Sequence, residues 1–152
     1  MSPAHHPEPI DPDVGAVPRG RSFGAALAVA AGGALGAPAR YGLDLAMPTT
    51  AAAFPWATFA VNVSGSFVLG ALLVLIVERW PPRRYLRPFA ATGFVGAYTT
   101  WSTFMVDTDL LIRNGHAGLA AAYVSASLAA GLLAVAAGFV VARRISLVPV
   151  GR

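Results

Sequence analysis

The sequence predicts an all-α membrane protein with four transmembrane helices. Of its 152 residues, 56% are hydrophobic and only 12% are charged, which is about half the charged fraction of an ordinary soluble domain. Four apolar runs without a charged residue follow one another along the chain, and each is long enough to cross the hydrocarbon core of a bilayer. The charged residues lie between these runs or in the tails.

Composition also limits the chemistry that the chain can perform. The sequence contains no cysteine, so disulfides and cysteine metal sites are excluded. All eleven basic residues are Arg. They flank the apolar runs and do not form one patch, so nucleic acid is not an expected partner.

We expect three parts along the chain. Residues 1–21 contain five prolines and three acids, a composition typical of a disordered tail. Residues 22–146 form the membrane domain, and residues 147–152 form a short C-terminal tail. The four helices are predicted at about 23–46, 54–78, 88–112 and 117–142.

The first predicted helix carries small residues on one face and charges near its far end. Gly32, Gly33 and Gly36 lie near one face and allow the backbone of a neighbouring helix to come close. Arg40 and Asp44 are four residues apart. They form either an ion pair at the membrane interface or, in the sharper interpretation, a positive vestibule at Arg40 that concentrates anions.

The second predicted helix carries a polar stripe. Thr58, Asn62 and Ser66 recur every four residues and therefore share one face. An Asn at membrane depth is costly unless its amide is paired. Asn62 either joins two helices by a hydrogen bond or offers its NH₂ donors to a passing anion. The sequence does not decide between these two roles.

The third predicted helix is expected to break in the middle of the membrane. The stretch from Gly93 to Phe104 combines two glycines with Thr99-Thr100 and Ser102-Thr103, which lowers helix propensity where a spanning helix needs it most. Backbone groups freed in hydrocarbon survive only where they are buried in protein or line a polar cavity. The break therefore indicates a functional site, although small residues for close helix packing are the alternative.

Two further sets of side chains share helical faces. Trp101 and Phe104 are three residues apart, so both rings would face one path; the alternative for this pair is packing in the core. On the fourth predicted helix, Tyr123, Ser127 and Gly131 recur every four residues and again share one face.

The arginines are distributed unevenly over the two sides of the membrane. With four spans, one side carries both termini and the second loop, and it holds nine of the eleven arginines. They are Arg19, Arg21, Arg79, Arg83, Arg84, Arg87, Arg143, Arg144 and Arg152. Positive charge favours the cytoplasmic side, so we expect both termini in the cytoplasm.

The uncharged donors of the predicted spans suit an anion better than a cation or a proton. All seven acids are expected in loops, tails or helix ends, so no carboxylate is available for a proton relay within the membrane. No nucleophile–base pair or carboxylate dyad is visible in the spans, so an enzyme is not expected. A ring of neutral donors can replace the hydration of a small anion.

These motifs together resemble the CrcB/Fluc fluoride channel family. The resemblance covers residues 23 to 142, with the order and spacing of the motifs intact. The matching segments are Gly32-Gly33 with Gly36-Ala37 and Arg40-Tyr41, the run from Thr58 to Phe67, the run from Gly93 to Phe104, and Tyr123 with Ser127.

The resemblance implies a fluoride-specific channel that passively exports fluoride across the bacterial plasma membrane. It implies a dimer of two four-helix subunits inserted antiparallel among the membrane lipids, with two pores. Pore positions carried over by the resemblance are Asn62, Phe104, Tyr123 and Ser127, with Thr58 as a weaker candidate. It also implies a structural Na⁺ ion, not transported, held by the backbone carbonyls of Gly96 and Thr99.

The chain departs from the family pattern at two positions and in its charge. Trp101 stands where the family has its first pore phenylalanine, and Gly131 stands where a small polar residue would extend the polar face. A homodimer that inserts in both directions should have little charge asymmetry. The partner is therefore either a second copy or an oppositely oriented paralogous subunit.

Two other functions remain open from the sequence. A fluoride/proton-coupled transporter would use the same fold. A non-transporting membrane assembly subunit would use the small residues for packing, but it would not need aligned polar side chains on spanning faces.

Overall fold

The computed structural model describes residues 19–50, 52–79 and 84–146. The predicted C-terminal tail at 147–152 and most of the predicted N-terminal tail lie outside these residues. The first helix begins at Arg19, so it includes the last three residues of the predicted 1–21 tail.

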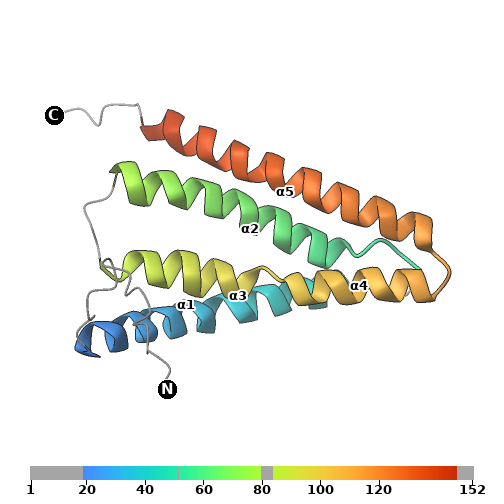
Figure 1. Cartoon of the computed structure of the whole chain (residues 1–152), viewed down its shortest axis with the longest axis horizontal. Helices are drawn as coiled ribbons and strands as arrows, with labels where there is room; N and C mark the ends of the chain where they lie inside the picture. Colours follow the sequence, from blue (N-terminus) through green and yellow to red (C-terminus); the bar gives the residue numbers. More distant parts are fainter. Residues whose placement is uncertain (1–18, 51, 80–83, 147–152) are drawn as a thin grey trace, which may run out of the picture.

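The described residues form four helical rods that run alternately in opposite directions (Figure 1). Several rods consist of more than one element. The elements are α1 (Arg19–Ala46), α2 (Trp56–Val74), η1 (Leu75–Arg79), η2 (Pro88–Val95), α3 (Gly96–Tyr98), α4 (Trp101–Arg113) and α5 (Ala117–Ser146), where η1 and η2 are π-helical. The start of α1, the end of η1, the start of η2 and the end of α5 lie at one end of the bundle, and the turn between α4 and α5 lies at the other (Figure 1).

Glycines bring the backbones of α1 and η2 together. A Cβ atom at Gly32 would collide with the backbone of Phe89 and Phe94, and one at Gly36 would collide with the carbonyl of Phe94. The close approach predicted for Gly32 and Gly36 is therefore confirmed. Gly33 makes only an ordinary contact, since its Cβ would lie 3.8 Å from the Cβ of Ala97.

The helices α2 and α5 approach each other in the same way. A Cβ atom at Gly70 on α2 would collide with the carbonyl of Val135 on α5. In return, a Cβ atom at Gly138 on α5 would collide with the carbonyl of Phe67 and would lie 3.0 Å from the amide nitrogen of Ala71. These reciprocal glycines fix how closely and in which register α2 and α5 pack.

We expect Gly138→Ala to lower the thermal stability of the purified protein, because the added methyl group must push the α2 backbone away. Overpacking of this kind costs about 1–3 kcal/mol, which outweighs the gain of about 1 kcal/mol from the higher helix propensity of Ala. Gly118→Ala is the matched control on the same helix, since nothing lies within 4 Å of its Cβ position. Thermal unfolding followed by size-exclusion chromatography measures both variants, and equal stability of Gly138→Ala and wild type would contradict the close packing.

Among the residues that the structure describes, two helices are long and apolar enough to cross a membrane. They comprise Trp56–Glu78, with a mean hydropathy of 2.3, and Ala117–Ile145, with a mean hydropathy of 2.2. A core helix of a soluble protein also meets these criteria, but it would be mostly buried. Only 22% and 6% of the two segments are buried within the chain, so their apolar side chains face a surrounding that is not this chain.

Candidate functional site

The third rod changes its backbone conformation at Thr99 and Thr100. Both residues are extended, with φ −76° and ψ 158° at Thr99 and φ −145° and ψ 124° at Thr100. Local side-chain bonds favour this geometry. The Thr99 hydroxyl donates to the Val95 carbonyl at 2.9 Å, and the Thr100 hydroxyl oxygen accepts from the Thr103 amide at 3.1 Å. Thr100 is thus the N-cap of α4.

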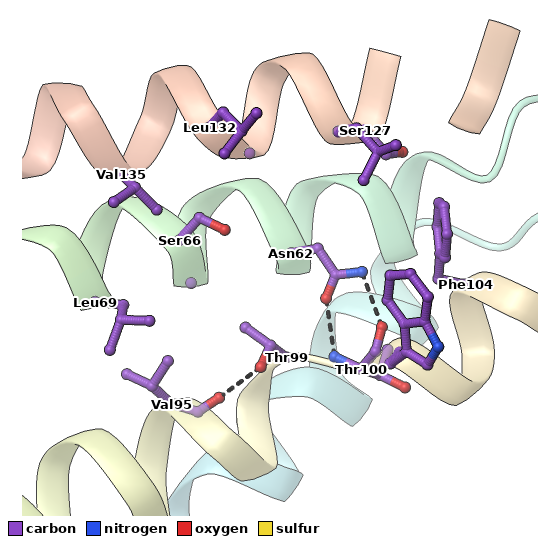
Figure 2. Close-up of a pocket in the computed structure, with 14 residues that line it drawn as sticks. Asn62, Ser66, Leu69, Val95, Thr99, Thr100, Phe104, Ser127, Leu132 and Val135 are labelled. Carbon is purple, nitrogen blue, oxygen red and sulfur yellow. Dashed lines mark hydrogen bonds between the residues drawn. The ribbon is translucent and has the colours of Figure 1, made fainter. Parts of the chain in front are cut away.

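Asn62 binds the extended segment from α2 (Figure 2). Its Nδ2 donates to the Thr100 carbonyl at 2.9 Å, and its Oδ1 accepts from the Thr100 amide at 2.8 Å. The side chain therefore binds both backbone groups of Thr100, and it supplies the partner of the Thr100 amide, which donates to no helical carbonyl. The Asn62 amide has a second N–H that takes no part in these two bonds. Asn62 can therefore join two helices and also donate to an anion.

The same rearrangement releases the carbonyls of Gly96 and Thr99 from their usual helical donors. In a continuous helix these carbonyls accept from the amides four residues later, which belong to Thr100 and Thr103. The Thr100 amide instead donates to Asn62, and the Thr103 amide donates to the Thr100 hydroxyl. Gly96 is exposed on the surface of the chain. Freed carbonyl oxygens fit a hard cation such as Na⁺, which prefers oxygen ligands.

A cavity of about 370 Å³ lies beside the extended residues Thr99 and Thr100, between α2, α4 and α5 (Figure 2). Its wall is mostly apolar, and none of the residues that line it is charged. Its polar members are Asn62, Ser66, Thr99, Thr100 and Ser127. The Ser127 hydroxyl is buried and has no hydrogen-bond partner within the described residues, which leaves it free to bind a ligand in the cavity.

The aromatic residues predicted to share one path have different surroundings. Phe104 is 4% exposed and belongs to a buried cluster with Tyr123, while Trp101 is 68% exposed. The ring of Phe104 lies 5.1 Å from that of Tyr123 and 5.2 Å from that of Trp101, measured between centroids. Phe104 and Trp101 both line the cavity. The alternative of core packing therefore applies in part to Phe104, but it does not apply to Trp101.

Tyr123 is completely buried. Its hydroxyl lies near Thr58 and Asp107, but it forms no hydrogen bond of acceptable geometry with any described residue. A buried hydroxyl without a partner is costly and is found where a ligand or water completes the bonding. Together with Ser127, one turn later on α5, it makes two buried donors on one face.

The prediction that all acids lie in loops, tails or helix ends is wrong for Asp107. It lies inside α4, which continues to Arg113, and its Oδ2 accepts from the Thr58 hydroxyl at 2.6 Å. The uncharged run ends at Asp107, but the helix predicted to about 112 already extends past it, and α4 ends at Arg113. Thr58 on α2 supplies a partner for the carboxylate. The Thr58 hydroxyl, a candidate donor to an anion, is therefore engaged.

Asp107 also lines a second cavity of about 220 Å³, together with Thr49, Thr50 and Leu110. Phe104 lines the first cavity and lies one turn before Asp107 on the same helix. The group of Phe104, Tyr123, Thr58 and Asp107 therefore lies between the two cavities. Asp107 could have been found in the sequence by continuing the Phe104 face by one turn.

Arg40 lies near the end of α1 and lines neither cavity. Within the described residues no ion pair joins it to Asp44. The alternative of an Arg40–Asp44 ion pair is thus not seen in the structure.

Fold and cavity define a helical membrane protein with a cavity lined by uncharged donors. More particularly, the chain belongs to the CrcB family. The model of the family described as "CrcB-like protein, Camphor Resistance (CrcB)" matches residues 27–139. The predicted family resemblance is confirmed.

Curated relatives support the same family. The protein "Fluoride-specific ion channel FluC 3" of Streptomyces avermitilis is 56% identical over 120 residues, which cover 79% of this chain and 59% of that protein. The "Fluoride-specific ion channel FluC 2" of the same organism is 47% identical, over 66% of this chain and 63% of that protein. The "Fluoride-specific ion channel FluC 1" of Mycobacterium tuberculosis is 49% identical over 121 residues, 79% of this chain and 91% of that protein. The chain thus spans less than two thirds of the length of the two Streptomyces relatives.

Proposed function

We propose that this chain is a subunit of a fluoride-specific ion channel that passively exports fluoride across the bacterial plasma membrane, and that it is not an enzyme. The observation that carries the proposal is the pair of buried hydroxyls, Tyr123 and Ser127, that have no partner within the described residues. Ser127 lines the uncharged cavity, and Tyr123 packs against Phe104, which lines it too. Relatives that are about half identical to the chain are named fluoride-specific ion channels.

The chemistry of the cavity supports a small anion as its ligand. Hydroxyls and the remaining amide N–H of Asn62 can replace the hydration shell of fluoride without a fixed positive charge. A fixed cation in the cavity would bind the ion so tightly that release would be slow. The edge of an aromatic ring carries partial positive charge, so Phe104 adds a weak attraction. The negative-inside membrane potential then drives fluoride outward without coupling to another ion.

The two cavities support a path along α4 and α5. Fluoride entering the cavity of about 220 Å³ would pass Tyr123 and Phe104 to reach the cavity of about 370 Å³. Thr58 holds the Asp107 carboxylate to one side by a short hydrogen bond, which limits its repulsion of the anion. Arg40, at the end of α1, is proposed to concentrate anions outside this path.

The proposed channel is a dimer of two antiparallel subunits, each with four membrane spans and a break of the third span in the middle of the membrane. The cavity beside the break is open on one side, where Trp101 is 68% exposed. A second subunit on this face would complete the wall. The partner is a second copy or a paralogous subunit with the opposite charge bias; the cytoplasmic position of both termini follows from the arginines.

We include a structural Na⁺ ion in this proposal, held by the Gly96 and Thr99 carbonyls. When bound, the ion would offset the partial negative charge of these carbonyl oxygens, and it would take no part in transport. Asn62 and Thr100 contribute by keeping the Thr100 and Thr103 amides away from these carbonyls.

The direct test is fluoride efflux from liposomes that contain only this purified protein. We expect rapid efflux in the presence of a potassium ionophore that holds the voltage, and no chloride efflux under the same conditions. Protein-free liposomes are the control. Fluoride efflux from the single chain would establish a homodimer, whereas efflux only after co-reconstitution with a paralogue would establish a heterodimer. Absence of efflux in both experiments would reject the channel and leave the non-transporting assembly subunit.

Asp107 favours a second candidate, the fluoride/proton-coupled transporter. A carboxylate within a helix that also lines a cavity could carry a proton, and the sequence argument against proton coupling assumed that none was present. Efflux measured at fixed voltage with and without a pH gradient separates the two functions. We expect equal rates for a channel, and a rate that follows the gradient would favour the transporter.

A further inference from the structure

Ser66 on α2 differs from other hydroxyl residues in the helices near the break. Ser64 donates to the Ala60 carbonyl at 2.6 Å, and Thr108 donates to the Phe104 carbonyl at 2.8 Å. Such bonds to the preceding turn are the usual arrangement for a hydroxyl in an apolar surrounding. The Ser66 hydroxyl has no hydrogen-bond partner within the described residues, and Ser66 lines the cavity (Figure 2).

Next to the Ser66 hydroxyl, α5 carries Gly131, which has no side chain. A Cβ atom at Gly131 would lie 3.7 Å from the Ser66 Oγ, and no other atom outside its own helix lies within 4 Å. Gly131 follows Ser127 by one helical turn and Tyr123 by two. The series of donors on α5 therefore ends at Gly131, at the level where α2 presents the Ser66 hydroxyl.

The packing of the two helices holds Ser66 in this place. The contacts of Gly70 with Val135 and of Gly138 with Phe67 lie one to two turns further along the pair. They bring the two backbones together and fix their register. Beyond Ser66 the cavity wall becomes apolar, with Leu69, Leu132 and Val135.

We propose that Ser66 is an anion-coordinating residue that supplies, from α2, the donor that α5 lacks at Gly131. This inference rests on the channel function proposed above. Asn62 and Ser66 are one turn apart on α2, so a fluoride ion leaving Asn62 and Ser127 meets the Ser66 hydroxyl next. Without it, the ion would enter a stretch lined by Leu and Val side chains, where nothing replaces its hydration.

The experiment moves the hydroxyl from one helix to the other. Ser66→Ala should reduce fluoride efflux from liposomes by about ten- to a hundredfold, as expected for a lost hydrogen bond to a charged group. Adding Gly131→Ser to Ser66→Ala should restore most of the efflux, because the new hydroxyl enters the same space. Adding Gly131→Ala to Ser66→Ala is the matched control, with the same backbone change and no hydroxyl, and it should not restore efflux. Ser64→Ala should conduct as wild type does.

The outcomes separate this inference from the channel proposal. If the wild type conducts fluoride and Ser66→Ala conducts it at the same rate, the role of Ser66 is overturned and the channel proposal stands. Equal restoration by Gly131→Ser and Gly131→Ala also overturns it, since volume and not the hydroxyl would then matter. Absence of fluoride efflux from the wild type, alone and with a paralogue, overturns the channel and Ser66 together.

Discussion

Asn62→Ala is expected to reduce fluoride efflux by about a hundredfold or more, which corresponds to about 2.7 kcal/mol. The substitution removes the remaining amide N–H of a residue that lines the cavity. It also leaves the Thr100 amide without its partner and removes one bond to the Thr100 carbonyl. Each buried backbone group left unpaired costs about 1–3 kcal/mol, so we expect lower thermal stability together with the loss of efflux.

A second variant separates the two roles of Asn62. Asn62→Asp keeps an oxygen that accepts from the Thr100 amide, but its second carboxylate oxygen faces the Thr100 carbonyl and cannot donate to an anion. We expect Asn62→Asp to conduct no more fluoride than Asn62→Ala, although the Thr100 amide keeps its partner. Size-exclusion chromatography, thermal unfolding and liposome efflux measure all three proteins. Efflux at the wild-type rate from either variant would remove Asn62 from the path.

Local sequence signals were sufficient for the helical fold and for the position of the unusual segment. The spacing of the polar residues placed Asn62, Tyr123 and Ser127 on definite helical faces, and the structure brings Asn62 and Ser127 to one cavity. The low helix propensity of Thr99-Thr100 identified the residues that are extended. These features depend on residues close together in the sequence, which is why they could be predicted.

Features that depend on pairs of distant residues could not be predicted in this way. Asn62 and Thr100 are 38 residues apart, so the sequence could not show that the amide binds both backbone groups of Thr100. The release of the Gly96 and Thr99 carbonyls follows from that pair. Asp107 was placed at a helix end because it closes an uncharged run, and its partner, Thr58, lies 49 residues away. A carboxylate is tolerated within an apolar segment only when a partner binds it, and the sequence does not show such a distant partner.

Tyr123→Phe is expected to reduce fluoride efflux by about tenfold or more while leaving the fold as stable as before, or more stable. The Tyr123 side chain is completely buried, and its hydroxyl has no hydrogen-bond partner within the described residues. Removing an unpaired buried hydroxyl relieves a desolvation cost of about 1–3 kcal/mol. If the same hydroxyl donates to fluoride, its loss weakens a hydrogen bond to a charged group, worth about 1.5–3 kcal/mol. A purely structural role cannot produce lower efflux together with unchanged or higher stability.

Tyr98→Phe is the matched control, because it makes the same chemical change where the hydroxyl already has a partner. The Tyr98 and Ser64 hydroxyls lie 2.9 Å apart, and neither residue lines the two cavities. We therefore expect Tyr98→Phe to lose about 1 kcal/mol of stability and to keep the wild-type rate of efflux. Thermal unfolding and liposome efflux are measured for both variants. We expect Tyr123→Phe to lose efflux and keep its stability, and Tyr98→Phe to lose stability and keep its efflux. Lower stability of Tyr123→Phe with unchanged efflux would show that its hydroxyl supports the fold and does not meet the anion.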